Sequence, residues 1–412
     1  MTGEYQTERN GYVALKLQTA IRERATGTGA RILPITGGGG KYSRGASGSG
    51  LVRRDGLSVR GRLDGQKTQG AYPSELVIGT VADELYAAIM RAEYAAGAAI
   101  TQATAALSSA TVSASGSTVT FSAGSVIAAG VRVGEVHRWS AGLAAGDLNQ
   151  NLICVAVTAT SITYHRALTA VTGPVASYSF GQPGRLLSNP ANPIKRYFTI
   201  EEAELDIAGG ELFGDAMFSK FGLKMATTGA VTTSFDWVGA GDFEPIDAGD
   251  GPWFTDPADY DGEPLSVVDC TVRLGSEVLV DLTGLDITFD IGATAEEVCG
   301  AKVSPNVADG ALTINVNVTA LRKNLAWVKA VHEETPLSLH FLAEGPESAG
   351  AKPFFYLHIP NFTVNEAAKS EFSKNGKTKI NTLTVPRELV GIDTRGGAYR
   401  ATMATIQISN AS

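Results

Sequence analysis

The most constraining feature of this sequence is an order of segments that occurs twice along the chain. In each half, an apolar strand precedes a short helix with a threonine cap, and further strands follow the helix. In the first half, the strand is 76–78, Thr80 caps the helix, and the later strands are 196–207 and 216–237. In the second half, the strand is 311–318, Thr319 caps the helix, and the later strands are 353–359 and 372–385. The sequence therefore predicts an internal duplication of a mainly β unit with one short flanking helix in each copy.

Only the first half carries an additional stretch between its helix and its later strands. Residues 97–184 alternate Ser, Thr and Val between turn signals, as the runs 111–121 and 152–164 show. Such alternation is typical of short β-hairpins, so we expect a small separate β module here. The glycine-rich run 37–50 lacks the apolar residues that would order it on its own.

Charge is distributed unevenly along the chain. The net charge is −8, but residues 1–70 hold 12 Lys and Arg against 5 Asp and Glu, which leaves −15 for the remainder. The basic residues occur singly and with few aromatics, so docking of this arm onto an acidic neighbouring subunit is favoured over nucleic-acid binding. Residues 242–263 hold eight carboxylates and no basic group, which predicts an acidic linker.

Motifs that carry chemistry are missing from the sequence. The run 37–41 lacks the first Gly of a phosphate-binding loop, the five histidines do not occur at metal-binding spacing, and there is no GxSxG nucleophile motif. The three cysteines are widely spaced, and no stretch of about 18 apolar residues occurs. We therefore expect no catalytic residues, no cofactor, no metal and no membrane span.

Several runs resemble those of the tail tube (major tail) proteins of long-tailed bacteriophages. Two segments of the module, 130–134 and 155–163, are similar to a small β domain that many of these proteins carry. The N-terminal and late runs that carry the resemblance are 14–20, 25–29, 34–38, 54–56, 61–65, 70–76 and 218–237.

The resemblance implies a duplicated tail-tube-type β-sandwich or barrel domain with a flanking helix in each copy. It implies homo-oligomeric rings that stack into a tube, contact the tape measure and terminator proteins, and let DNA pass without specific binding. The expected ring is a trimer or a hexamer: if both halves are tube domains, three chains supply the six-fold ring that six single-domain chains would form. The location is then the virion tail, after synthesis in the host cytoplasm. An acidic wall suits a passive conduit, because each cation that neutralises a phosphate would bind the DNA.

The expected domains follow from these segments. They are residues 1–96 as an N-terminal arm and the first part of tube domain 1, 97–185 as the inserted β domain, 186–241 as the second part of tube domain 1, 242–263 as the acidic linker, and 264–412 as tube domain 2. Candidate subunit-interface residues are Arg53 and Arg54 as charged anchors and Tyr72, Trp253 and Phe254 as apolar anchors.

Two other functions share the Ser- and Thr-rich β pattern. A carbohydrate-binding or adhesion β-protein of a phage or cell surface would need clustered exposed aromatics, but the four tryptophans are far apart in the sequence. A β-rich hydrolase, such as a tail-associated depolymerase, would need carboxylates that converge in space. Neither alternative has a sequence motif in its favour, so the structural role is the preferred hypothesis.

Overall fold

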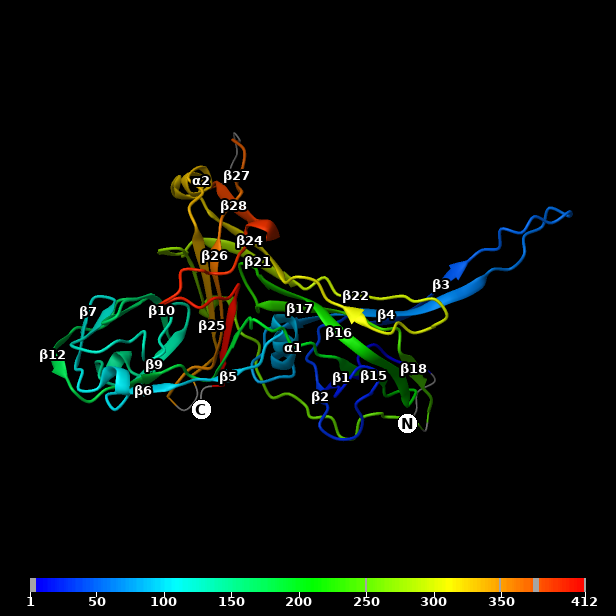
Figure 1. Cartoon of the computed structure of the whole chain (residues 1–412), viewed down its shortest axis with the longest axis horizontal. Helices are drawn as coiled ribbons and strands as arrows, with labels where there is room; N and C mark the ends of the chain where they lie inside the picture. Colours follow the sequence, from blue (N-terminus) through cyan, green and yellow to red (C-terminus); the bar gives the residue numbers. More distant parts are fainter. Residues whose placement is uncertain (1–4, 249, 348–349, 373–377, 411–412) are drawn as a thin grey trace.

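A computed structural model describes residues 5–248, 250–347, 350–372 and 378–410. The chain is mainly β, as predicted, with two short α-helices among the described residues, α1 (Ala82–Met90) and α2 (Ala326–His332). Neither of these helices has the length and apolar character needed to cross a bilayer. Figure 1 shows a long central sheet, a β-rich module at one end and a projecting ribbon at the other.

Eight strands form one continuous antiparallel run through the largest sheet. Their order in space is β3 (Gly39–Ser47), β4 (Arg62–Glu75), β17 (Thr232–Gly239), β16 (Gly209–Met225), β21 (Leu282–Asp290), β24 (Thr313–Leu321), β28 (Ile380–Val385) and β27 (Glu366–Lys369). The first four strands come from the first half of the chain and the last four from the second half. The pairing of β16 with β21 therefore joins the two halves.

Each half also builds a smaller sheet with the same order of strands. In the first half, it is β2 (Arg31–Ile32), β1 (Gly11–Leu17), β15 (Phe198–Glu204), the start of β16 and β18 (Phe243–Ile246). In the second half, it is β20 (Glu277–Val278), β19 (Cys270–Leu274), β25 (Leu337–Glu344), β26 (Phe354–Phe362) and β29 (Thr405–Ser409), extended by β14 (Arg185–Ser188) and β5 (Ala95–Ala96).

A register irregularity falls at the same place in both smaller sheets. It lies between Phe198 and Ile200 where β15 pairs with β16, and between Leu337 and Leu339 where β25 pairs with β26. In both cases the opposite strand advances by one extra residue, which is the geometry of a β-bulge. The two halves thus share their strand order and the position of this irregularity, although their amino-acid sequences differ.

A third sheet of eight strands lies between α1 and β14 in the sequence and has its own core. It consists of β12 (Val171–Val175), β7 (Val112–Ser115), β8 (Thr118–Phe121), β11 (Ser161–Tyr164), β10 (Leu152–Val157), β9 (Val136–Ala141), β13 (Ser179–Gly181) and β6 (Ala99–Thr101). Phe121, Trp139 and Phe180 are buried at its centre. Short elements complete the fold: β22 (Thr294–Ala295), β23 (Val307–Ala308), and the 3-10 turns Ala105–Leu107, Ala145–Asp147, Val267–Asp269 and Arg387–Leu389.

The main core is continuous between the two halves, and α1 lies at its centre. Tyr86 of α1 packs against Phe221 at 5.0 Å and Phe235 at 5.6 Å between ring centroids, both in the first half. It also packs against Phe355 of the second half at 5.3 Å. Almost all residues of α1 are buried, whereas no residue of α2 is. α1 is thus covered by strands of both halves, whereas α2 is mostly exposed.

Several local predictions differ from the structure. Thr319 lies within β24, and α2 begins after Asn324, whose side-chain oxygen accepts the Ala326 amide at 2.9 Å. The glycine-rich run is part of β3, because pairing with β4 supplies the order that its sequence lacks. Residues 76–78 follow the long strand β4 and form no strand of their own. The hairpin predicted over 216–237 is present as β16 and β17.

Removing the Tyr86 ring should strongly destabilise the chain. The side chain is fully buried, so Tyr86→Ala leaves a large cavity and is expected to lower the free energy of unfolding by about 3–5 kcal/mol. The Tyr86 hydroxyl has no hydrogen-bond partner among the described residues, so the matched control Tyr86→Phe should change stability by less than about 1 kcal/mol. Denaturant unfolding measures both values, and an equal loss in the two variants would contradict this account of the core.

Candidate assembly surfaces

The eight-stranded run ends in two strands that are paired on one side only. β3 pairs with β4, and β27 pairs with β28. Beyond β27, Ser370 donates its amide to the Ile380 carbonyl at 3.1 Å, so the even-numbered residues of β27 face β28. The amides of Ala367 and Lys369 therefore point to the free side. Unpaired edges of this kind accept a further strand unless something covers them.

The free edge at β3 carries a carboxylate that occupies one of its donors. Gly40 donates its amide to Glu202 Oε1 at 2.5 Å, and the same oxygen accepts the Tyr72 hydroxyl at 2.6 Å. Burial raises the pKa of Glu202, although these two hydrogen bonds act in the opposite direction. Tyr72 is fully buried, and both its burial and the nearby Glu202 charge raise its pKa well above the ordinary value. Glu202 thus satisfies an edge amide from within the sheet.

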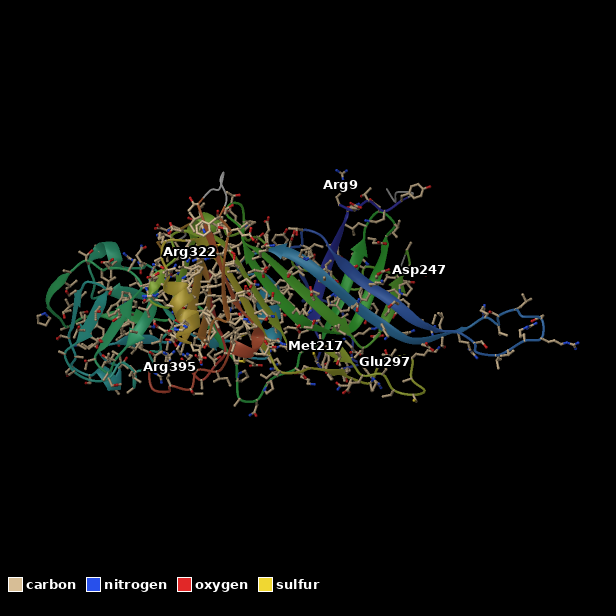
Figure 2. All side chains as sticks on the ribbon, turned by 90° about the horizontal axis from the view of Figure 1, so that it is seen from above. Arg9, Met217, Asp247, Glu297, Arg322 and Arg395 are labelled. Atoms are coloured by element: carbon tan, nitrogen blue, oxygen red, sulfur yellow. The ribbon has the colours of Figure 1, made fainter. Side chains whose placement is uncertain are left out.

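Like charges gather at the two edges with opposite sign. At the β3 edge, burial and then the charges of Glu202 and Glu204 raise the pKa of Glu211. At the β27 edge, desolvation and then the charges of Lys369 and Arg322 lower the pKa of Lys379. Figure 2 shows Arg322 beside α2, at the far end of the sheet from the projecting ribbon. Acidic side chains thus lie beside the β3 edge and basic ones beside the β27 edge, although β3 itself carries Lys41 and Arg44 and β27 carries Glu366.

The outward face of the eight strands is polar and close to neutral. Opposite residues in a sheet share a face, so the registers place four lysines and five carboxylates there. They are Lys41, Lys67, Lys220, Lys224, Glu75, Asp236, Asp286, Asp290 and Glu366. Lys220 Nζ lies 3.5 Å from Asp290, Lys67 Nζ lies 2.6 Å from Glu297, and Lys224 is opposite Asp286. Thr, Ser and Asn occupy most of the remaining positions.

The ribbon formed by β3 and β4 projects well beyond the sheet (Figures 1 and 2). Its connecting loop, residues 48–61, is almost entirely exposed. Arg53 forms an ion pair with Asp55 at 2.6 Å, whereas Arg54 makes no ion pair within the described ranges. The two arginines proposed as charged anchors thus lie on the loop and face solvent.

Of the three aromatic anchors proposed from the sequence, Tyr72 and Phe254 are buried inside the chain and Trp253 is partly exposed. Phe254 is fully buried against Ala14 and Ala30, and its amide and that of Trp253 donate to the two oxygens of Glu201 at 3.1 and 2.6 Å. The Trp253 indole donates to the Ala25 carbonyl at 2.8 Å. The rings of Phe254 and Tyr72 are therefore both buried in a single chain. The sequence could not indicate this, because the partners of 253–254 are distant in the chain.

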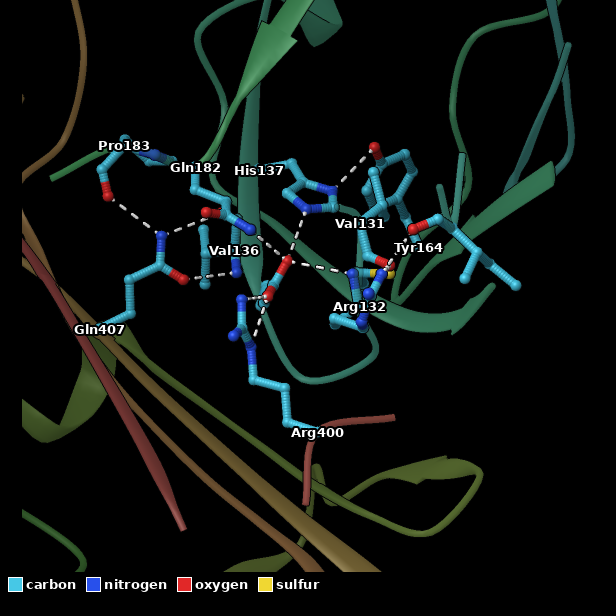
Figure 3. A network of polar contacts seen from close by, with 12 residues as sticks. Val131, Arg132, Val136, His137, Tyr164, Gln182, Pro183, Arg400 and Gln407 are labelled. Carbon is cyan, nitrogen blue, oxygen red and sulfur yellow. Dashed lines mark hydrogen bonds and ion pairs between the residues drawn. The ribbon is translucent and has the colours of Figure 1, made fainter. Parts of the chain in front are cut away.

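A buried polar network joins the third sheet to the rest of the molecule (Figure 3). Glu135, which has no exposed surface, accepts hydrogen bonds from Arg400 Nε at 2.8 Å and from Gln182 at 2.5 Å. Burial acts to raise the pKa of Glu135, but the contact with His137 and the charge of Arg400 outweigh it and leave the pKa below its ordinary value. Gln407 of β29 bonds both backbone groups of Val136, at 2.8 and 3.0 Å. These contacts link the third sheet to the smaller sheet of the second half.

The sequence comparison agrees with this architecture. The model of a family described as phage tail tube protein matches residues 9–383, and the chain belongs to that family. The resemblance noted in the sequence is confirmed, and the chain is a structural component of the phage tail and hence of the virion. No curated protein matches its sequence. Among the described residues, no group of three or more His, Cys, Asp or Glu side chains could hold a metal ion.

Buried histidines at the joint between the sheets should make the chain sensitive to acid. Burial lowers the pKa of His358 to about 3, although the charge of Asp393 acts to raise it, and burial lowers that of His165 to about 4. Both values lie below the ordinary value of about 6.5, so the stabilisation is complete above pH 6.5 and is lost as the pH falls towards 4.

In the unmodified chain, the free energy of unfolding falls between pH 6.5 and pH 4. We expect this decrease to be smaller by roughly 2–3 kcal/mol in His358→Phe, because phenylalanine cannot be protonated. Denaturant unfolding between pH 4 and 8 measures the effect. His332→Phe, on the exposed surface of α2, is the matched control for replacing an imidazole by a phenyl ring. An unchanged slope in His358→Phe would contradict the assignment.

Proposed function

We propose that copies of this chain join edge to edge into closed rings and that the rings stack to form the tail tube. The observation that carries the proposal is the internal seam, where β16 of the first half pairs with β21 of the second half. By analogy with this internal pairing, β27 of one copy would pair with β3 of the next copy. Strand direction alternates through all eight strands, so this new pairing is antiparallel, as the internal one is.

The agreement of strand order and bulge position supports two tube domains in one chain. Each half supplies four strands to the run and one smaller sheet behind it. A ring of three copies then has the six-fold arrangement of domains that single-domain members of the family reach with six. The domain boundaries, with residues 97–185 inserted into tube domain 1 and 242–263 as the connection to tube domain 2, remain part of this proposal.

The outward polar face is our candidate for the wall of the channel. Its lysines lie close to carboxylates, so few free cations are available to bind phosphate and release counterions. This face is closer to neutral than the acidic wall expected from overall charge, because most of the acidic excess lies elsewhere. DNA would pass along such a wall without specific binding during delivery into the host cell.

The projecting loop is our candidate for contacts between successive rings. Arg53 and Arg54 are exposed at its tip and fit an acidic surface on another copy. The tape measure and terminator proteins would contact the inside and the end of the tube, respectively. Synthesis in the host cytoplasm would precede assembly.

No observation favours the carbohydrate-binding or adhesion alternative. Stacking on sugars needs exposed aromatic rings, but Trp139 and Trp237 are fully buried in two different cores. Trp253 and Trp327 are only partly exposed and belong to different halves. A hydrolase such as a depolymerase would need converging carboxylates. Glu202, Glu204 and Glu211 do gather near the β3 edge, but there Glu202 accepts the Gly40 amide and the Tyr72 hydroxyl.

Blocking the free amides of β27 should prevent ring formation. Ala367→Pro removes a donor that faces away from β28, so the pairing within the chain is kept and the pairing with the next copy is lost. The unmodified protein should form rings or tubes in negative-stain electron microscopy, and the variant should remain monomeric in analytical ultracentrifugation. Ala367→Val keeps the amide and serves as the control. Intact rings of Ala367→Pro would refute the edge pairing.

Reversing the charge of the loop should affect stacking and leave the rings intact. For Arg53→Glu with Arg54→Glu we expect isolated rings and at least a tenfold loss of tubes in electron micrographs, because complementary charges would become repulsive. Arg9→Glu with Lys329→Glu, at two exposed positions away from the loop, makes the same change in net charge and is the control. Tubes of normal length in the double variant would count against a stacking role of the loop.

A further inference from the structure

The internal seam gives a template for the register between copies. Across it, Leu223 of β16 is opposite Ile287 of β21, and Gly222 is opposite Thr288. Both Leu223 and Ile287 are buried on the inner face of the sheet. If the seam between copies repeats this geometry, each of these residues has a counterpart at a free edge.

The bulge fixes which residues correspond. Aligning the register irregularities of the two smaller sheets equates Ala216 with Phe362, and continuing along the strand equates Leu223 with Lys369. The same alignment equates Phe235 of β17 with Leu383 of β28, because these residues are opposite Phe221 and Ala367, respectively.

The partner strand follows by the same steps. Phe235 is opposite Tyr72, and Leu383 is opposite Val318, so Tyr72 and Val318 correspond. Counting from them through β4 and β24 equates Gly40 with Ile287 and Lys41 with Thr288. No further irregularity occurs in the strands over these residues.

We propose that in the ring, which rests on the function proposed above, Lys369 of one copy lies opposite Gly40 of the next copy and its ammonium group pairs with Glu202 there. Ala368 is then opposite Lys41 on the outward face. The rings of Phe213 and Trp237 fill the inner face over Gly40, so the Lys369 side chain would lie along the Phe213 ring and reach the Glu202 carboxylate that accepts the Gly40 amide. In the single chain, the Glu202 carboxylate accepts the Gly40 amide at the free edge. In the ring, the incoming β27 strand would accept this amide in place of Glu202.

Charge at both edges supports this assignment. Glu204 and Glu211 lie near Glu202 and no cation forms an ion pair with any of them in the described part of the chain. Lys369 similarly has no anionic partner there and lies in the field of Lys379. Joining the edges would therefore relieve like-charge repulsion on both sides.

A disulfide between copies tests the register directly. Lys41→Cys with Ala368→Cys, in a background with the exposed Cys299 replaced by Ser, places the two thiols opposite each other. The free amides of Ala367 and Lys369 make residue 368 part of a close, non-hydrogen-bonded pair, with a Cα separation of about 4.5 Å that suits a disulfide. Under mild oxidation, non-reducing electrophoresis should show covalent dimers and trimers.

The control variant moves one cysteine by two residues, as Lys41→Cys with Glu366→Cys, and should cross-link at least tenfold more slowly. Preferential cross-linking of this control in assembled rings would overturn the register while leaving edge pairing intact. If the unmodified chain forms no rings at any concentration, both the register and the proposed function are wrong.

The ion pair is tested by a double-mutant cycle on ring assembly. Lys369→Met and Glu202→Gln should each raise the concentration at half assembly by about tenfold. The combined variant should assemble no more weakly than either single variant, because both remove the same pair. Lys379→Met is the matched control and should add its effect independently to that of Glu202→Gln. Additivity of Lys369→Met and Glu202→Gln would overturn the pair.

Discussion

The pairing of β16 with β21 is the interaction on which the rest of the structure depends. It turns two four-stranded sheets into one antiparallel run and so gives the chain one polar outward face and one apolar inner face. The inner face is closed by α1, whose Tyr86 contacts aromatic rings of both halves. The same pairing moves the unsatisfied edges to β3 and β27, the two ends of the run. Within this eight-stranded run, every strand between the two ends is paired on both sides.

The seam within the chain and the proposed seam between copies differ in chemistry for a physical reason. The alignment of the halves places Phe341 where the first half has Glu202, and Phe355 where the first half has Gly209. It places Leu223 where the second half has Lys369. The internal seam forms once, during folding, and can be apolar. Edges that stay exposed until assembly need charge, because an apolar edge would pair without control.

Much of the fold could be predicted from the sequence, but individual contacts could not. Alternation indicated the β class, the hairpin over 216–237 and the extra module, since period-two patterning is a local signal. Thr319 was wrongly predicted as a cap because a threonine before a helical pattern also suits a strand, where it pairs across to Thr382. The surroundings of Tyr72 and Phe254 depend on Glu202 and Glu201, more than 50 residues away in sequence, and no local pattern reports such contacts.

The position of the third sheet explains how one half can carry it without disturbing the seam. The smaller sheet of the second half turns Phe355 towards α1 and Tyr356 towards the third sheet, because neighbouring residues of a strand face opposite ways. The third sheet therefore covers an outer face. In the first half, the corresponding outer face bears Ala14 and Glu201, and it is covered by Phe254. The third sheet and the segment with Phe254 thus bury the outer faces of the two smaller sheets. Both covers lie on the side away from the eight-stranded run, so the two edges of that run stay free.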